Sequence, residues 1–557
     1  MPIHLQPGLA APAVATRLAA WRDAAVAGRL LAHDAALWTD AGIADTPGDP
    51  IAERLGWLDL PVTSPASLPA WQRLADQARA DGIRHIVLLG MGGSSLGAEV
   101  LARSLPRAAG APELVVCDST HPAFVRAVDA VVDPSRALVV AASKSGTTVE
   151  TTAHFAHWWA RLRADVPDPA AHCIAITDAG SPLAALAAER GFRACVVAPG
   201  DVGGRFSVLG PFGLLPAMLA GVDVAPVLDG AGAARAALAA AARRAEGDLV
   251  AQDDAFGPSA SAERTSGLAL GAALGAWAAA GLDTLVIDAG PPFEAMTGWL
   301  EQLLGESLGK HGRGLFPARP WGGKAGRRLA RVTIEVRATH TGGAAGEEPA
   351  APGILVRIGS PEDLGAALFA WEVATATAAL AMGVQPFDQP DVEAAKRFAR
   401  AAAAAGQGSP RPAGAAEAEE LRATDIADVL RIARPWLTAI PPDGAIAVQA
   451  FLPPTAANDA ALDGLARALD EATGAAVAWG YGPRYLHSTG QLHKGGPARI
   501  HCLQLVDGDP GQTSDGDVPI PDAGISFGLL IAAQAAGDAA ALAALGRPPL
   551  VVRVGGA

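Results

Sequence analysis

Short β-rich runs alternate with helical stretches through the first half of the chain, and this rhythm restricts the possible folds most. The runs lie at residues 83–89, 113–119, 137–143, 172–178 and 194–199. Such alternation predicts a parallel sheet covered by helices on both faces, because parallel neighbours need a long crossover connection. Ligands bind such sheets outside the carboxyl ends of the strands. We therefore expect an α/β domain over residues 81–260 with its site at that edge.

A second series of β-rich runs occupies the rest of the chain. Its members lie at residues 283–290, 328–338, 353–359, 445–451, 476–482 and 498–506. With 557 residues, 50% of them hydrophobic, the chain can bury more than one core. We expect a second α/β domain with a C-terminal extension over residues 261–557, and a helical segment over residues 1–80. The apolar run 266–282 is short for a membrane span and is expected as a buried helix.

The net charge of −14 limits the partners of the chain. An acidic field repels nucleic acids and anionic membrane surfaces, so neither is expected as a partner. An anionic small molecule must then be captured by local groups. The four cysteines are scattered, and the N-terminal sequence MPIHLQPGLA lacks a basic stretch followed by an apolar one. These features favour a cytoplasmic protein with reduced thiols.

The turn after the run 137–143 is rich in hydroxyl groups. The sequence SKSGTT places Ser143, Ser145, Thr147 and Thr148 between a strand and the helix that follows. Hydroxyls and free N–H groups at a helix N-terminus can bind one tetrahedral anion, aided by the helix dipole. The lysine of this turn adds a full positive charge. Ser and Thr also cap helices commonly, but a single cap needs one hydroxyl, so we favour an anion site.

The segment GMGGSSLG, residues 90–97, has the same position after the run 83–89. Its glycines allow a close approach of the backbone to a ligand, and Ser94 and Ser95 supply hydroxyls. The glycine spacing departs from the dinucleotide-binding pattern, so a nicotinamide cofactor is the weaker interpretation. Glycines that serve only a tight turn are a further alternative.

Three other segments carry side chains that could take part in chemistry. Arg205 follows two glycines in DVGGRFS and could stabilise an oxyanion, although arginines near loops are often solvated. Gln302 and Glu306 are four residues apart and share one face of an expected helix. A buried carboxylate there could remove a proton from carbon, whereas most helix glutamates are solvated. Gln389 and Lys396 are seven residues apart and could share a helix face, or could mark a proline-framed turn.

Two histidines lie in the glycine-rich segment RYLHSTGQLHKGGP, residues 484–497. The spacing of His487 and His493 matches no common zinc motif, so no metal site is expected. A neutral histidine in the crevice could move a proton between sugar oxygens, and a packing role for one of the two is an equal alternative.

Together, five segments resemble the glucose-6-phosphate isomerase (phosphoglucose isomerase) family, which is built from two sugar-isomerase (SIS) domains. They are GMGGSSLG, SKSGTTVETT, DVGGRFS, EQLLGES-LGK and PFDQPDVEAAK, with the loop around His493 as a sixth piece. More narrowly, RYLHSTGQLHKGGP makes the chain similar to the isomerase portion of bacterial fusions of transaldolase with this isomerase. The resemblance implies an α/β fold of two doubly wound SIS-type αβα sandwich domains with a helical N-terminal segment. It also implies interconversion of glucose 6-phosphate and fructose 6-phosphate through a cis-enediol(ate), with no metal or redox cofactor.

The resemblance also implies roles for individual residues. Gly93 and Ser94 would contact the sugar, and Gln302 would lie beside the base in the substrate site. The residues on the family's phosphate-binding stretch are Ser143, Lys144, Ser145, Thr147 and Thr148. Arg205 would stabilise the enediolate, and Glu306 would be the base that moves a proton between C1 and C2.

The end of the pattern carries a departure from the family. Gln389 and Lys396 match the paired glutamine and lysine of the family motif F-D-Q-x-x-V-E-x-x-K. His493 would open the sugar ring, but in most of the family this histidine precedes the glutamine and lysine instead of following them. The alternatives are His487, His311 and His340.

Other functions fit part of the pattern. An isomerase that also accepts mannose 6-phosphate would keep every motif. A non-catalytic SIS module that senses sugar phosphates would keep SKSGTT but has no use for Glu306, Gln389 and Lys396, whose joint presence favours an enzyme. A nicotinamide-linked dehydrogenase is a third alternative. Because active sites are shared in the family, the resemblance implies a homodimer that acts on a hexose 6-phosphate.

Overall fold

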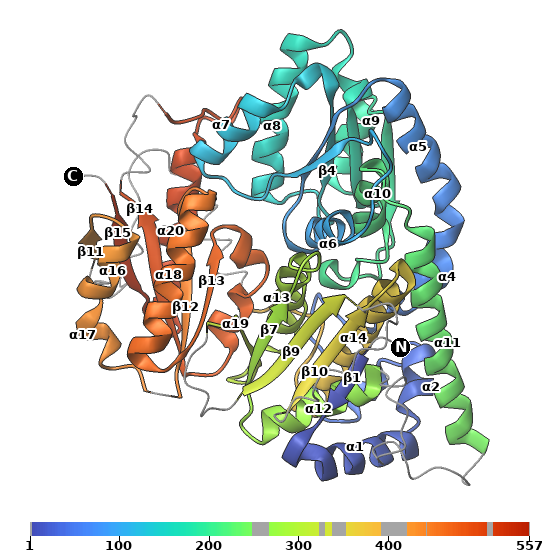
Figure 1. The fold of residues 1–557 in the computed structure, drawn as a ribbon. Coiled ribbons are helices and arrows are strands. Elements are labelled where there is room, and N and C mark those ends of the chain that lie inside the picture. The colour runs from blue at the N-terminus through green and yellow to red at the C-terminus, as the bar shows by residue number, and fades with distance from the viewer. Residues whose placement is uncertain are drawn as a thin grey trace, which may run out of the picture.

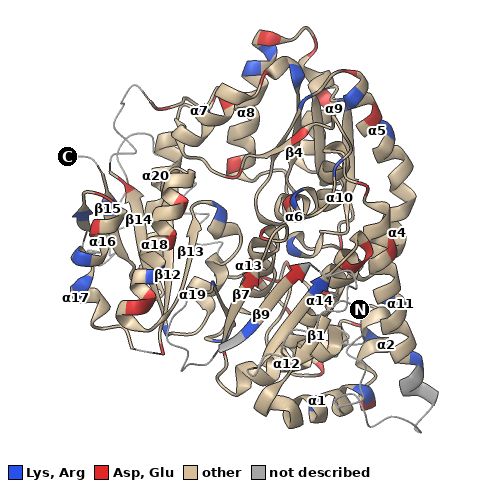
Figure 2. Cartoon of the chain, in the orientation of Figure 1, with Lys and Arg blue, Asp and Glu red and all other residues tan. Residues whose placement is uncertain are grey.

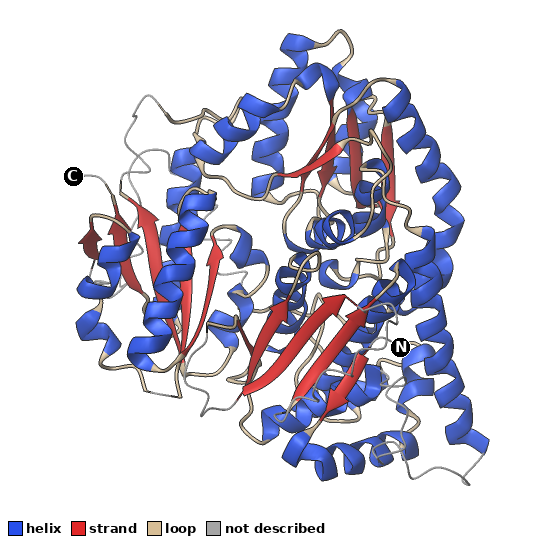
Figure 3. Ribbon diagram, in the orientation of Figure 1, coloured by secondary structure: helices blue, strands red, loops and turns tan. Residues whose placement is uncertain are grey.

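The computed structural model describes residues 3–247, 267–321, 329–336, 352–391, 420–441, 443–508 and 516–555. Over these residues the chain forms three five-stranded sheets with helices packed against them (Figures 1 and 3). We call the parts that carry the sheets the first unit (81–224), the second unit (267–391 together with the N-terminal strand) and the third unit (420–555).

The first sheet is fully parallel and uses the five runs expected from the sequence. Its strands are β2 (His85–Leu89), β3 (Glu113–Val116), β4 (Ala137–Ala142), β5 (Cys173–Asp178) and β6 (Ala194–Ala198), in the order β3-β2-β4-β5-β6. All six residues of β4 are buried, as expected for a central parallel strand covered on both faces. Leu89 of β2 lies opposite Ala141 of β4, so the turns after these two strands leave the sheet at the same edge.

The second sheet is parallel except for one strand. It contains β1 (Ile3–Gln6), β7 (Thr284–Ala289), β8 (Phe316–Ala318), β9 (Leu329–Val336) and β10 (Gly353–Ile358), in the order β1-β10-β9-β7-β8. The N-terminal strand β1 pairs antiparallel with β10, with Ile3 opposite Val356. The sequence predicted only helices over residues 1–80. Strand β1 and its pairing with β10 of the second unit were therefore not expected.

The third sheet is again fully parallel. Its strands are β11 (Glu420–Ala423), β12 (Ala445–Phe451), β13 (Ala476–Tyr481), β14 (Ile500–Asp507) and β15 (Leu550–Val554), in the order β11-β15-β14-β12-β13. The β-rich runs from residue 283 onward are expected from the sequence in one α/β domain, whereas they lie in two sheets. The expected C-terminal extension therefore carries a sheet of its own.

Helices connect and cover the strands. The N-terminal ones are α1 (Ala11–Asp23), α2 (Val26–Leu31), α3 (Ala36–Thr39), α4 (Leu60–Thr63) and α5 (Leu68–Ala80). The first unit has α6 (Leu96–Ser104), α7 (Pro122–Val131), α8 (Val149–Asp165), α9 (Pro182–Arg190) and α10 (Pro211–Leu219), and α11 (Ala225–Gly247) follows. The second unit has α12 (Gly267–Ala279), α13 (Ala295–Leu308) and α14 (Pro361–Met382). The third has α16 (Ile426–Ile432), α17 (Arg434–Leu437), α18 (Ala456–Thr473), α19 (Gly490–Gly495) and α20 (Phe527–Ala544).

Two described helices, α14 and α20, are long and apolar enough to cross a membrane by length and composition alone. In the fold, 89% of the apolar window of α14 and 61% of that of α20 are buried inside the protein. The helix expected within 266–282 is α12, and it is also largely buried. Their apolar character is therefore accounted for by packing against other parts of the chain.

One large core joins the N-terminal helices to the first and second units, and the third unit has a separate core. Trp57 of the N-terminal segment packs against Phe206 of the first unit and Phe369 of the second. The third unit, orange in Figure 1, is attached to the others by polar contacts as well. Arg484 pairs with Glu99 at 2.6 Å, and Arg499 pairs with Asp283 at 2.8 Å.

Acidic and basic residues are mixed on exposed helices such as α5 and α16 (Figure 2). On α16, for example, Arg431 pairs with Asp428 at 2.7 Å. Such exposed pairs contribute little to stability. The chain carries a net charge of −14, so its overall field does not attract an anion. An anionic ligand must be bound by local groups, as the sequence predicts.

Candidate active site

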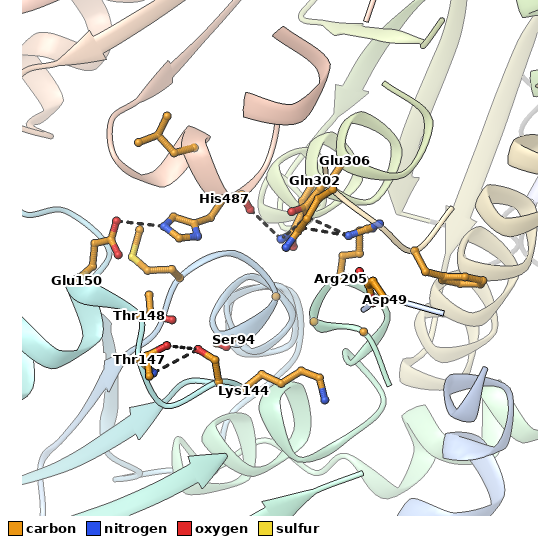
Figure 4. Close-up of a pocket in the computed structure, with 18 of the residues that line it drawn as sticks. Asp49, Ser94, Lys144, Thr147, Thr148, Glu150, Arg205, Gln302, Glu306 and His487 are labelled. Carbon is orange, nitrogen blue, oxygen red and sulfur yellow. Dashed lines mark hydrogen bonds and ion pairs between the residues drawn. The ribbon is translucent and has the colours of Figure 1, made fainter. Parts of the chain in front are cut away.

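A cavity of about 530 Å³ opens where the three units meet, which is a size typical of small-molecule sites (Figure 4). The predicted residues that line it are Gly93, Ser94, Lys144, Ser145, Thr147, Thr148, Arg205, Gln302, Glu306 and Gln389. Each of these residues follows the carboxyl end of a strand or lies on the helix after it, or, for Gln389, follows helix α14. The crevice expected at the carboxyl edge of the first sheet is therefore shared with the other two units.

The hydroxyl-rich turn connects β4 to α8. Ser143 is only 2% exposed; its hydroxyl accepts the N–H of Gly146 at 3.1 Å and bonds the Thr148 hydroxyl at 2.9 Å. Ser143 thus shapes the turn and is not among the lining residues. The Ser145 hydroxyl bonds that of Thr147 at 3.0 Å, and both face the cavity at the N-terminus of α8. This end of the cavity can bind an anion.

Gly146 is required by the shape of this turn. Its φ of +68° lies in the left-handed region, and an added Cβ would come within 2.8 Å of the backbone nitrogen of Leu183. The neighbouring Lys144 ammonium donates to the Asp178 carboxylate at 2.7 Å and to the carbonyl of Gly200 at 3.1 Å. The lysine charge is thereby held at the rim of the anion site.

The glycine segment after β2 brings two backbones into contact. A Cβ on Gly93 would lie 2.1 Å from the carbonyl oxygen of Gly204, so only glycine fits between the 3-10 turns at Gly92–Ser94 and Gly204–Phe206. This approach places Ser94 and Arg205 on the walls of the same cavity. The glycines therefore serve a close approach between two backbone segments of the protein.

Arg205 lines the cavity, and its guanidinium is held by hydrogen bonds to three acceptors of the protein. Its Nε donates to the Ser307 hydroxyl at 2.8 Å, and its Nη2 donates to the carbonyls of Pro386 and Asp388 at 2.6 and 2.9 Å. The residue is 5% exposed. A guanidinium held this way needs no rearrangement to stabilise negative charge on a ligand.

Glu306 lies in the last turn of α13 and is 7% exposed. Gln302 donates from Nε2 to Glu306 Oε2 at 3.2 Å, which confirms that the two side chains share a helix face. The Nη1 of Arg205 lies 3.7 Å from the same carboxylate oxygen and donates to Gln389 Oε1 at 3.4 Å. A carboxylate, a guanidinium and two amides therefore converge at one end of the cavity.

Lys310 lies behind this end of the cavity and is fully buried. Its ammonium, 0% exposed, bonds the Asp388 carboxylate at 2.7 Å and also donates to the carbonyl of Gln385. Burial, and then the nearby Arg205 guanidinium, lower the pKa of Lys310 to about 8. Because Asp388 also holds Arg205 through its carbonyl, Lys310 fixes the segment that leads to Gln389.

The two histidines of the third unit have different surroundings. His493 is 5% exposed, its Nδ1 bonds Gln449 Nε2 at 3.1 Å, and burial lowers its pKa to about 3. It is not a lining residue, so the geometry does not support the ring-opening role expected for it. His487 does line the cavity, and its Nε2 lies 3.1 Å from Glu150 Oε1 (Figure 4). The structure therefore favours His487, one of the alternatives named from the sequence.

Three further predicted residues are not among the lining residues of the part of the chain that the structure describes. His311 is exposed and is not a lining residue of the cavity. Lys396 and His340 fall outside the described residues. Their roles stay predictions from the family resemblance.

Several lining residues were not predicted. They include Asp49, Arg54, Glu150, Asp178, Lys494 and Gln534. Glu150 is two residues after Thr148 in the quoted stretch SKSGTTVETT, so its position was available from the sequence. Gln534 lies in an alanine-rich helix, far in sequence from the quoted motifs, and carried no such signal.

The chain is similar to known proteins. A family model described as Phosphoglucose isomerase matches residues 72–244. The glucose-6-phosphate isomerase of Rubrobacter xylanophilus is 30% identical over 397 residues, which cover 62% of this chain and 88% of the relative. That of Symbiobacterium thermophilum is 32% identical over 278 residues, covering 47% of this chain and 57% of the relative.

Two solved structures share the fold. A hypothetical protein from Thermus thermophilus superposes with a TM-score of 0.56 and 23% identity, covering 72% of this chain and 98% of that one. A glucose-6-phosphate isomerase from Chlamydia trachomatis superposes with a TM-score of 0.50 and 20% identity, covering 61% and 73%. The predicted α/β class with SIS-type sandwiches is confirmed by these likenesses. Because the match to the Rubrobacter xylanophilus relative spans most of that protein, the chain belongs to the glucose-6-phosphate isomerase family.

Proposed function

We propose that this cavity binds a hexose 6-phosphate and interconverts glucose 6-phosphate and fructose 6-phosphate, with Glu306 as the base. One observation carries the proposal: a buried carboxylate, a fixed guanidinium and a hydroxyl-rich helix N-terminus line the same cavity. An anchor for a phosphate and a base for a carbon-bound proton are what this isomerisation requires.

The phosphate would bind at the turn between β4 and α8. Ser145, Thr147 and Thr148 supply hydroxyls there, and the positive end of the α8 dipole favours an anion. Lys144 would add its charge from the rim. Binding at this end would hold the sugar so that its first two carbons reach Glu306, and binding energy would become orientation at the reacting atoms.

His487 would open the sugar ring. Glu150, as an acceptor, favours the form of the imidazole that carries its proton on Nε2, which leaves Nδ1 as an acceptor. Nδ1 would take the proton of the O1 hydroxyl and give it to the ring oxygen as the C1–O5 bond breaks. Glu150 stabilises the imidazolium that forms between these two steps.

Isomerisation would follow on the open chain. Glu306 removes the proton from C2, and the electron pair moves through the C1–C2 bond to leave negative charge on O1. Arg205 stabilises this enediolate, and the protonated Glu306 returns the proton to C1 as O2 becomes the ketone oxygen. The proton of O2 passes to O1, so substrate and product have the same composition. Gln302 would keep the Glu306 carboxylate oriented.

The test is a coupled assay of the purified full chain in both directions, with the product of each direction measured. Turnover of glucose 6-phosphate to fructose 6-phosphate that disappears in Glu306→Gln is the expected result. Tight binding of both sugars without turnover would instead indicate a non-catalytic sugar-phosphate module, and would refute the proposal. A parallel assay with mannose 6-phosphate separates the bifunctional alternative, because only that enzyme forms fructose 6-phosphate from both aldoses.

We also propose that the chain acts in the cytoplasm as a homodimer. The scattered cysteines support the location. His487, the histidine proposed to open the ring, lines the same cavity as Glu306 of its own chain. A dimer would then form without lending a histidine to the site of its partner.

A further inference from the structure

Helix α20 of the third unit presents two polar side chains in an otherwise apolar sequence, FGLLIAAQAAGDAAALAA. They are Gln534 and Asp538, which are four residues apart and so lie on one face of the helix. Gln534 is 2% exposed and Asp538 is 0% exposed. Burial of an amide and a carboxylate is costly unless both are hydrogen-bonded. The hydrogen-bond partners of these two side chains therefore show which parts of the protein this helix face holds in place.

Gln534 reaches Glu150, the carboxylate that bonds His487. Its Nε2 donates to Glu150 Oε1 at 2.7 Å, and its Oε1 accepts from the Thr120 hydroxyl at 2.6 Å. An ionised carboxylate has only acceptor atoms, so it selects the NH₂ end of the amide. The Thr120 hydroxyl, on the other side, can donate to the remaining oxygen. Both ends of the amide are thereby fixed.

The same carboxylate oxygen serves His487. Glu150 Oε1 lies 3.1 Å from His487 Nε2 and 2.7 Å from Gln534 Nε2. Glu150 is 4% exposed, so these contacts lie away from solvent, where a charge-assisted hydrogen bond is strong. The orientation of the imidazole therefore depends on an amide from α20.

Asp538 acts on the segment that carries His487. It accepts from the Tyr485 hydroxyl at 2.5 Å and from the buried Lys494 ammonium. Tyr485 is two residues before His487, and Lys494 is seven residues after it. The second polar residue of α20 thus holds both sides of the loop whose histidine the first polar residue reaches through Glu150.

We propose that α20 positions His487, with Gln534 acting through Glu150 as a positioning residue for ring opening. The inference rests on the proposed function of His487. It assigns a role in the reaction to a helix of the third unit, in a part of the chain where the family resemblance named only histidines.

The test replaces Gln534 by an apolar residue of similar length. Gln534→Leu is expected to lower kcat about 10-fold with KM within about twofold, the scale seen when a group behind an active residue is removed. In a His487→Ala background the same change should alter kcat by less than about twofold, because residues that act through one another are not additive. An equal reduction in both backgrounds would overturn the inference.

A matched control exists in the same unit. Gln449, 0% exposed on β12, contacts the other histidine, His493. Gln449→Leu makes the same chemical change and is expected to leave kcat unchanged. If Gln534→Leu does not fold, Thr120→Val is the second variant, since it removes only the hydroxyl that orients the amide. A folded Thr120→Val or Gln534→Leu protein with wild-type kcat would contradict the proposal.

A spectroscopic measurement separates this inference from the proposed function. In protein labelled with ¹⁵N-histidine, the His487 imidazole signals are identified by their loss in His487→Ala. Gln534→Leu should shift them, and Gln449→Leu should not. Unshifted signals overturn the inference even if the wild-type protein is an active isomerase, whereas an inactive wild-type protein refutes the function whatever the signals show.

Discussion

The carboxylate of Glu306 is the group whose removal tests the proposed mechanism most directly. Glu306→Gln keeps the size and shape of the side chain but cannot take a proton from carbon. We expect kcat to fall by about 10² to 10⁴, the usual contribution of a general base, or about 3 to 5 kcal/mol of barrier. KM should change little, because the phosphate contacts at Ser145, Thr147 and Thr148 are not touched.

The fold should survive this change. Glu306 lies 3.7 Å from Arg205, but that guanidinium also donates to the Ser307 hydroxyl and to two backbone carbonyls. The arginine charge is therefore not left without acceptors when the carboxylate becomes an amide. We expect the free energy of unfolding to change by about 1 kcal/mol, below the cost of isolating a buried charge.

The assay has two parts. The coupled measurement of kcat and KM gives the loss of turnover, and NMR in deuterated water follows exchange of the hydrogen at C2 of the substrate. Both should fall together, while thermal unfolding shows a native protein. A folded Glu306→Gln variant with turnover within about threefold of wild type would refute the assignment of the base, given the range expected for one.

Three further predictions concern other parts of the chain. Lys144→Ala combined with Ser145→Ala should raise KM about 10-fold, because charge-assisted contacts to the phosphate are lost; unchanged affinity for sugar phosphate would mean that the anion site lies elsewhere. Glu372, 0% exposed and without a hydrogen-bond partner among the described residues, has a pKa raised well above 4.5 by burial. The folded state then binds its proton more tightly than the unfolded state, so stability should fall as the pH rises above about 4.5, and Glu372→Leu should raise the unfolding temperature more at pH 8 than at pH 5; equal shifts at both pH values would contradict this. Finally, a mixture of Glu306→Gln and His487→Ala proteins, unfolded and refolded together, should show no more than the sum of their residual activities, whereas shared sites would restore about a quarter of wild-type activity through mixed dimers.

Much of the fold could be predicted because its signals are local. The β-branched runs of the first sheet are separated by helical stretches, and the observed strands lie within a few residues of the expected ones. Strand β1 was missed because its partner β10 is far away in the sequence and four residues carry no period. The division of the later strands between two sheets was missed because which strands become neighbours depends on packing.

The site, too, has residues that local sequence signals predict and residues that they do not. Gln302 and Glu306 could be placed on one face from helical spacing alone, and the hydroxyl-rich turn from its position between a strand and a helix. The choice between His487 and His493 could not be made, because the two lie in one short glycine-rich segment and only its three-dimensional course turns one of them to the cavity. The contact between Gln534 and Glu150 joins residues 384 positions apart, and nothing near Gln534 in sequence indicates it.

The cavity draws its walls from the turns and helices of three units, each with a sheet of its own. Partial opening of any one of them would separate groups that must act together, even while most helices and strands stay formed. Heat or denaturant should therefore inactivate this protein before its secondary structure melts, with the earliest loss set by whichever junction between units is weakest. Enzymatic turnover would then report on how firmly the C-terminal part of the chain is seated against the rest.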